Sequence, residues 1–151
     1  MTFLRRHMLV LGGAALAGCT HAQPGASADA EAHLLTFSAQ LRGDQEVPPA
    51  TTLGQGQLDA VLDRRTRELR WKLQYAHLTA PVTGAHFHGP APAGANAAVV
   101  LPLPARLNSL AEGTAQLSEA QAADLQAGRW YVNLHTAAFP GGEIRGQVTP
   151  R

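Results

Sequence analysis

Cysteine, charge and recognisable catalytic motifs are all scarce in this 151-residue chain. The single cysteine, Cys19, excludes an internal disulfide, so packing alone must hold the fold. Charged residues make up 15% of the chain and hydrophobic residues 45%, which is typical of a globular protein rather than a disordered one. The sequence contains no glycine-rich phosphate loop, no nucleophile elbow and no helix with paired histidines. It therefore predicts one domain with a sizeable core and assigns it no reaction.

The balance of charge argues against one class of partner. The whole chain has 12 Lys and Arg against 11 Asp and Glu, a formal charge of +1. Arg5 and Arg6 lie in a segment that we expect to be removed, which leaves 10 basic residues against 11 acidic ones, a mature charge of −1. Proteins hold nucleic acid largely by neutralising its phosphates. No nucleic-acid partner is therefore expected.

Residues 1–19 have the layout of an export signal. A basic start at Arg5-Arg6 precedes an apolar run from Met8 to Leu16, which is too short to span a bilayer as a permanent helix. The run ends in Leu-Ala-Gly-Cys19, which resembles the lipobox of bacterial lipoproteins. That resemblance implies that Cys19 is acylated and becomes the new N-terminus; a free thiol in an ordinary signal peptide is the alternative. The arginine pair fits twin-arginine export as well as general export.

A tether and the domain follow this signal. Residues 20–32 are rich in Ala, Gly and Ser without periodicity, which predicts a flexible tether in which His21 has no role. The domain is predicted to occupy residues 33–151. A lipidated Cys19 would place it on the cell envelope, at the periplasmic face or the outer membrane, with the membrane as partner and an envelope protein or polymer as a further candidate.

From residue 33 onward apolar residues alternate and are interrupted by Gly and Pro, which predicts short β-strands. Residues 33–41 form the first. Residues 58–62 and 69–75 flank the charged turn 63–68 and predict a hairpin. Further strands are predicted at 82–88, 98–103, 113–117, 129–136 and 143–148.

One helix interrupts the strands. Ser118 is suited to cap its start, Gln121 completes a capping box, and Gly128 is suited to end it. About eight strands with one short helix predict an all-β fold, either an antiparallel β-sandwich or a flattened Greek-key barrel.

Three histidines are the candidate metal ligands. Strand alternation puts His86 and His88 on one face and Phe87 on the other, and it puts His135 on the polar face of a later strand. Neutral imidazole is a good ligand for copper or zinc, and three imidazoles leave one position open. The same spacing is equally compatible with histidines that only hydrogen-bond and fix the loop 89–96.

Other distinctive residues are interpreted as structural. Glu46 and Glu143 lie beside turn residues, and we expect them to accept hydrogen bonds from buried backbone N–H groups or to pair with an arginine such as Arg145. Four residues in phase with the core are expected to be packed, the histidines at strand ends and the tryptophans as core anchors: His33, His77, Trp71 and Trp130.

Three motifs occur in order along the domain: residues 41–49 (LRGDQEVPP), 86–91 (HFHGPA), and 130–136 (WYVNLHT) with 140–147 (PGGEIRGQ). Together they resemble the CHRD domain, named for chordin, over about residues 34–149. The resemblance implies a β-sandwich found in secreted bacterial proteins and in an animal developmental antagonist, acting as an extracytoplasmic binding or structural module. Its motif residues with expected structural roles are Gln45, Glu46, Pro48, Pro49, Asn133, Gly142, Glu143 and Arg145.

A second resemblance concerns the histidines alone. His86, His88 and His135 resemble the copper side of Cu/Zn superoxide dismutases. However, residues 89–100 contain no counterpart of that family's long zinc-binding loop, and its loop cysteine and disulfide are missing, so dismutation is not expected. Two hypotheses follow: a lipid-anchored binding module without catalysis, and a copper or zinc protein serving sequestration, redox chemistry on oxygen species, or structural bracing.

Overall fold

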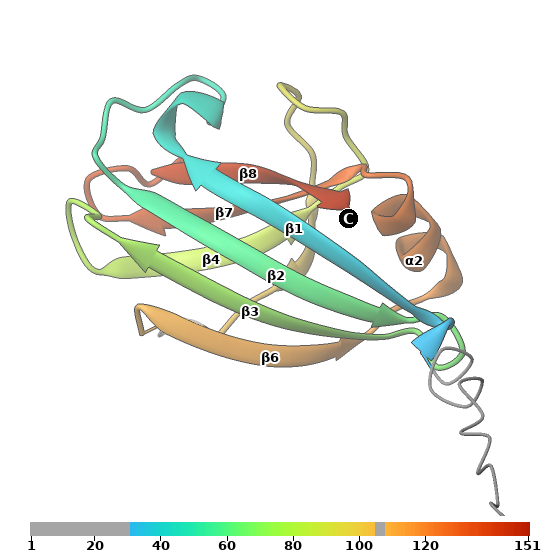
Figure 1. Ribbon diagram of the computed structural model, residues 1–151. Coiled ribbons are helices and arrows are strands. Elements are labelled where there is room, and N and C mark those ends of the chain that lie inside the picture. Colours follow the sequence, from blue (N-terminus) through green and yellow to red (C-terminus); the bar gives the residue numbers. More distant parts are fainter. Residues whose placement is uncertain (1–30, 105–107) are drawn as a thin grey trace, which may run out of the picture.

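Alternating apolar residues build eight antiparallel strands into one curled sheet (Figure 1). The computed structural model describes residues 31–104 and 108–151, so the predicted signal, Cys19 and most of the tether lie outside the described residues. The sheet order is β5-β4-β7-β8-β1-β2-β3-β6. The strands are β1 (Leu34–Arg42), β2 (Gln55–Asp63), β3 (Glu68–Ala76), β4 (Val82–His88), β5 (Val99–Pro102), β6 (Leu110–Gln116), β7 (Trp130–Thr136) and β8 (Ile144–Pro150). The predicted all-β fold of about eight antiparallel strands with one short helix is confirmed, in the form of a sandwich or half-barrel.

The core lies inside the curl of the sheet. The rings of Trp71 on β3 and Phe87 on β4 meet edge to face at 6.5 Å, although several strands separate β3 from β4 in the sheet order. Trp71 and Trp130 are buried, as predicted. Burying one large apolar side chain contributes about 2 kcal/mol, so this face supplies most of the stabilisation. Further fully buried members are Phe37, Leu41, Leu58, Leu62, Leu69, Leu73, Leu134 and Ile144.

Helix α2 (Glu119–Gln126) covers one end of the curled sheet (Figure 1). The predicted capping box is present: Gln121 N donates to Ser118 Oγ at 3.2 Å, and Ser118 N donates to Gln121 Oε1 at 2.9 Å. Gly128 follows the helix at a φ of +68°, a conformation that glycine adopts without strain. Leu125 is buried against the core, so the helix is held by packing as well as by its cap.

The expectation for His77 is wrong. The strand β3 ends at Ala76, whose partner Gln55 is the first residue of β2. His77 comes after this last pair, has a φ of +60° and is exposed to solvent. The alternation therefore does not determine the direction of the His77 side chain, because the hydrogen-bonded pairing of β3 with β2 has already ended at Ala76. His33 fits its expected role: it is partly buried, and its Nε2 lies 3.4 Å from Asp63 Oδ2.

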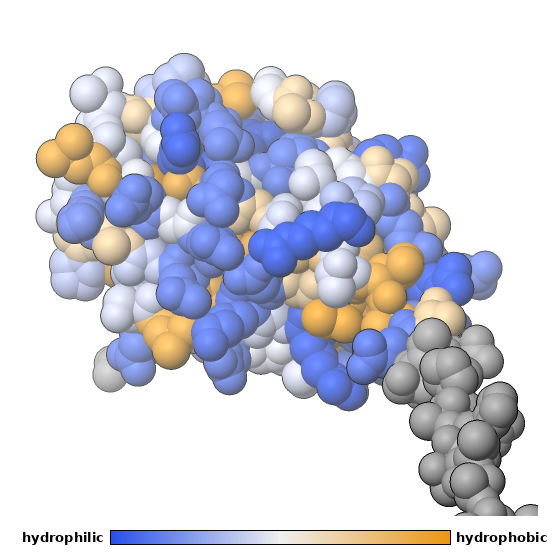
Figure 2. Space-filling view, in the orientation of Figure 1, coloured by the Kyte–Doolittle hydropathy of each residue, from blue (hydrophilic) through white to orange (hydrophobic). Residues whose placement is uncertain are grey.

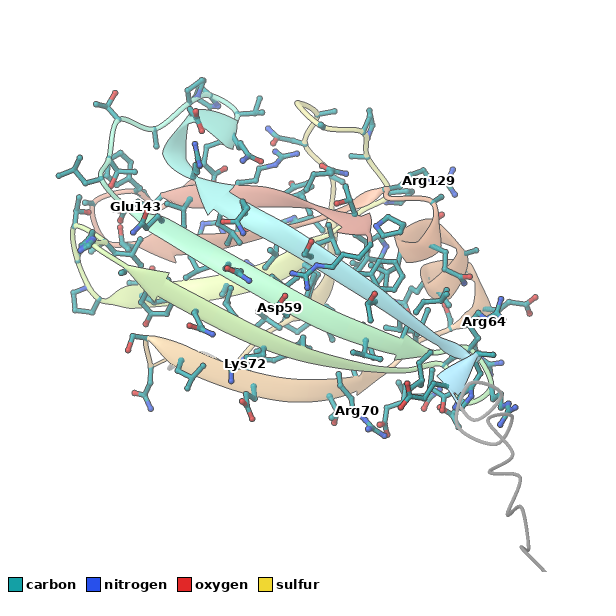
Figure 3. The ribbon with its side chains drawn as sticks, in the orientation of Figure 1. Asp59, Arg64, Arg70, Lys72, Arg129 and Glu143 are labelled. Atoms are coloured by element: carbon teal, nitrogen blue, oxygen red, sulfur yellow. The ribbon has the colours of Figure 1, made fainter. Side chains whose placement is uncertain are left out.

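The two outward faces of the sheet differ. The face of β1, β2, β3 and β6 towards the viewer is largely hydrophilic (Figure 2), with residues such as Asp59 and Lys72 opposite one another on neighbouring strands (Figure 3). Three outward residues of β7 and β8 are instead buried, with Tyr131 3%, Asn133 4% and Arg145 2% exposed. Among the described residues, none of the helices is long and apolar enough to cross a membrane.

Candidate functional site

The outward face of β4, β7 and β8 carries a row of polar side chains placed by the strand register. His86 lies opposite Asn133, and Asn133 lies opposite Arg145 on the next strand. Ala85 and Phe87 are buried in the core, at 1% and 0% exposed, so the pleat turns the histidines between and after them outward. A polar layer therefore lies on the opposite side of the sheet from the apolar core.

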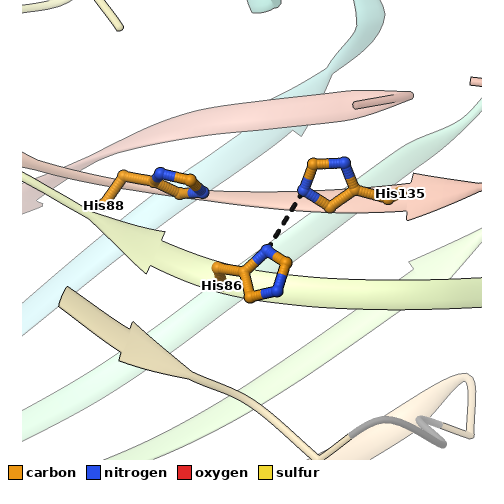
Figure 4. A group of neighbouring side chains, drawn as sticks. All are labelled: His86, His88 and His135. Carbon is orange, nitrogen blue, oxygen red and sulfur yellow. Dashed lines mark hydrogen bonds between the residues drawn. The ribbon is translucent and has the colours of Figure 1, made fainter. Parts of the chain in front are cut away.

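The structure brings the three predicted histidines together (Figure 4). His86 Nδ1 lies 3.2 Å from His135 Nε2, and one ring nitrogen from each histidine lies within 4.8 Å of the others. An ion about 2.0–2.1 Å from each nitrogen requires these nitrogens to move together by roughly 1 Å. His86 is only partly buried, so rotation of its side chain can supply the movement. Three imidazoles at this spacing fit copper or zinc.

Backbone carbonyls fix the tautomers of two of these rings. His88 Nδ1 donates to the carbonyl oxygen of Ala97 at 3.0 Å, and His135 Nδ1 donates to that of Pro140 at 2.9 Å. A carbonyl only accepts, so Nδ1 carries the hydrogen in both rings, and Nε2 of the neutral ring carries the lone pair. Both Nε2 atoms lie inside the cluster, 3.1 Å from Asn133 Oδ1. Histidines that ligate metals are usually oriented in this way.

A stack of three side chains supports His88 from one side. Its ring is parallel to that of Tyr131, with an interplanar angle of 1° and centroids 4.7 Å apart. The Arg145 guanidinium carbon lies 3.4 Å from the Tyr131 centroid. Arg145 donates to Asn96 Oδ1 at 3.0 Å and to the Ala95 carbonyl at 2.6 Å. The loop that covers the site is thus fastened to the same stack that holds His88.

Electrostatics keep the histidines of β4 neutral. Burial lowers the pKa of His86, and the neighbouring His135 and His88 lower it further. Burial also lowers the pKa of His88, and its hydrogen bonds to Ala97 and Asn133 do not outweigh this effect. A metal binds the neutral imidazole ring. Both lowered pKa values therefore favour the metal-binding form of His86 and His88 near pH 7.

Glu46 sits buried next to the cluster, at 5% exposed. Burial raises its pKa to about 7, although Arg145, the Asn133 side chain and the backbone of Val47 act in the opposite direction. Within the part of the chain that the structure describes, its Oε1 has no hydrogen-bond partner. Gly142 has a φ of +131°, which L side chains rarely adopt, and a β-carbon on it would lie 2.3 Å from that oxygen, so glycine is favoured there. Glu46 was expected to pair with an arginine such as Arg145. The charge of Arg145 does lower the pKa of Glu46, but it does not outweigh burial, because the Arg145 guanidinium donates its hydrogen bonds to Ala95 and Asn96.

Glu143 lies between the end of β7 and the start of β8 and links several segments by hydrogen bonds (Figure 3). Its carboxylate accepts from Thr52 Oγ1 at 2.7 Å, Thr79 N at 2.9 Å, Thr79 Oγ1 at 2.9 Å and Thr136 Oγ1 at 2.7 Å. Burial alone would raise its pKa, but these hydrogen bonds outweigh burial and lower it. One backbone N–H is among the donors, as expected, and three threonine hydroxyls are donors that the sequence interpretation missed.

The remaining motif residues frame the site without entering it. Gln45 Nε2 donates to the Gln40 carbonyl at 3.1 Å. Pro48 and Pro49 are exposed and line a cavity together with Glu46 and Gly142. Sequence interpretation missed the stacking of Tyr131 on His88. It also missed the hydrogen bonds from His88 and His135 to the backbone carbonyls of Ala97 and Pro140, because the position of a backbone carbonyl cannot be inferred from the residue type.

Comparison with known proteins identifies one family. A family model described as the CHRD domain matches residues 37–148, which is most of the chain and includes all the residues of the site. No curated protein and no solved structure matches the chain.

Proposed function

The chain belongs to the CHRD domain family, and we propose that it is an exported, lipid-anchored binding module that holds a copper or zinc ion through His86, His88 and His135. The observation that carries this proposal is the orientation of two rings by the Ala97 and Pro140 carbonyls. Each carbonyl takes the only hydrogen of a neutral ring and leaves its lone pair directed into the cluster.

A purely structural role explains only half of these contacts. The bonds from His88 to Ala97 and from Arg145 to Ala95 fasten the loop above the sheet, as a loop-fixing role requires. On the inner side, however, His86 Nδ1 is the one group among the described residues that lies near His135 Nε2 and can offer a hydrogen. Buried acceptors that lack donors are costly, and a cation satisfies several of them at once.

Metal loading of the mature chain tests the proposal. After treatment with a chelator, the protein is reloaded with Cu²⁺ or Zn²⁺ and analysed for metal content and affinity. We expect one ion per chain, and a loss of about 10-fold or more in affinity when His86, His88 or His135 is replaced by alanine. His77→Ala is the matched control, because His77 is exposed and lies outside the cluster. Wild-type protein without bound metal would refute the site.

The loop-fixing role predicts a different outcome of the same experiment. If the histidines only hold the loop, His88→Ala lowers the free energy of unfolding by the same amount with and without added metal. If they bind an ion, metal raises the stability of the wild type by an amount that grows with its concentration, and the variant lacks this increase.

The anchor is tested separately. The apolar run and the Leu-Ala-Gly-Cys19 ending support lipidation, which adds favourable membrane partitioning. Cys19→Ser is expected to move the protein from the membrane fraction to the soluble fraction while its metal content stays unchanged. A Cys19→Ser variant that stays with the membrane, with no incorporation of labelled fatty acid into wild type, would exclude the anchor.

A further inference from the structure

Asn133 occupies the centre of the histidine cluster. It lies on β7 opposite His86 and two residues before His135, and it is 4% exposed. Its Oδ1 is 3.1 Å from His88 Nε2 and 3.1 Å from His135 Nε2. No other described side chain forms hydrogen bonds with both of these nitrogens. Asn133 is therefore the candidate for a fourth ligand of the site.

The carbonyl side of the Asn133 amide faces the rings. Oδ1 is the amide atom that lies 3.1 Å from Nε2 of His88 and from Nε2 of His135. An amide oxygen only accepts hydrogen bonds, so Asn133 offers a lone pair to the cluster and no hydrogen.

Counting hydrogens then leaves more acceptors than donors in the cluster, because His86 Nδ1 can offer one hydrogen to His135 Nε2. Nε2 of His88 and Nε2 of His135 each present a lone pair, because their hydrogens lie on Nδ1. The oxygen between them is a third acceptor. The oxygen lies 3.1 Å from each of the two nitrogens, and acceptors at this distance repel one another unless an electron-pair acceptor lies among them. Distances of this size are also those between neighbouring ligands of one small ion, given bonds of about 2.0–2.2 Å.

We infer that the carbonyl oxygen of Asn133 is a further ligand, and that it makes the site selective for divalent copper and zinc over monovalent copper. This inference rests on the proposed metal site. Three imidazoles alone accept Cu⁺ as well as Cu²⁺ and Zn²⁺, whereas an amide oxygen is a hard ligand that favours the divalent ions.

Affinities for three ions measure this selectivity. Cu²⁺, Zn²⁺ and Cu⁺ are titrated into the metal-free mature chain and into Asn133→Ala, with Cu⁺ kept under a reductant and a competing chelator. We expect the affinities for Cu²⁺ and Zn²⁺ to fall by about 10- to 100-fold and the affinity for Cu⁺ to change by less than about 3-fold. The electron paramagnetic resonance spectrum of the Cu²⁺ form should change as well, because the ligand set loses its protein oxygen.

Two further variants separate ligation from folding. Asn133→Asp keeps an oxygen in either orientation and is expected to retain divalent binding. Gln147→Ala removes a neighbouring outward residue of β8, whose amide bonds the Ala91 and Gly128 carbonyls, and it should leave all three affinities unchanged. Thermal unfolding of each metal-free variant shows which are folded at the assay temperature, and Asn133→Asp carries the test if Asn133→Ala is not.

The outcomes distinguish this inference from the proposed function. If wild type binds metal and Asn133→Ala binds all three ions equally well, Asn133 is not a ligand, and the three-histidine site stands. An equal loss for Cu⁺ and the divalent ions also overturns the selectivity. If wild type binds none of the ions, the proposed function itself is wrong.

Discussion

Replacing Glu46 by glutamine should change how the stability of the protein depends on pH. The Glu46 carboxyl is buried at 5% exposed, and its pKa is raised from 4.5 to about 7. Below pH 4.5 the carboxyl is neutral in the folded and unfolded chains, so no buried charge opposes folding. As the pH rises through 7, the unfolded chain is already ionised and the folded chain must ionise a buried group, so stability is lost.

The size of the effect follows from the two pKa values. Between about pH 4.5 and pH 8.5 the linkage relation gives a loss of about 3 kcal/mol in the free energy of unfolding of wild type relative to the variant. The glutamine keeps the shape of the side chain and has no charge, so its own contribution is constant with pH. Urea unfolding of both proteins in a chelator, repeated at several pH values, measures the difference directly.

A second glutamate gives the matched control. Hydrogen bonds lower the pKa of Glu143, so its stabilisation is present above its ordinary pKa and is lost as the pH falls through the lowered value. The difference between wild type and Glu143→Gln should therefore shrink on acidification, opposite to the trend at Glu46. Parallel stability curves for wild type and Glu46→Gln over the whole range would refute the claim that Glu46 is a poorly compensated buried acid.

Three further predictions follow from the same structure. Gly142→Ala should lower the free energy of unfolding, measured by chemical unfolding, by about 2 kcal/mol or more, because φ at this position is +131° and the added β-carbon would lie 2.3 Å from Glu46 Oε1. Gly141→Ala is the control: its β-carbon would meet open space, so the free energy of unfolding should hardly change. Ser118→Ala removes the capping box with Gln121 and should cost about 1 kcal/mol in the same assay; an unchanged midpoint would contradict the assigned cap. Burial lowers the pKa of both β4 histidines, and a metal binds only the neutral ring, so Zn²⁺ affinity measured by titration calorimetry should be full near pH 7 and fall on acidification; an affinity that does not change with pH would contradict this.

Local patterns predicted the strands well, because each strand buries one face. Ala85 and Phe87 are apolar and His86 and His88 are polar, and this alternation correctly gave both the extent of β4 and the direction of its histidines. The capping box was equally readable, because its hydrogen bonds join residues three positions apart. Such features depend on neighbours in the sequence.

The same reasoning failed where a distant partner ends a pattern. His77 continues the alternation of β3, but the ladder stops at Ala76 because β2 begins at its partner, Gln55. Likewise, alternation gave the face of His135 without revealing that β7 pairs with β4, which is what brings His135 next to His86, 49 positions away. Pairing between strands is a property of the whole sheet.

By itself, the amino-acid sequence determined the type of fold, the limits of most strands and the three histidines on polar faces, because side-chain alternation and capping act over a few residues. Only the tertiary structure decided that these histidines meet, that the Ala97 and Pro140 carbonyls set two of their tautomers, and that Asn133 lies between them. Every residue has a carbonyl, so no sequence pattern shows which ones a folded chain will place behind an imidazole.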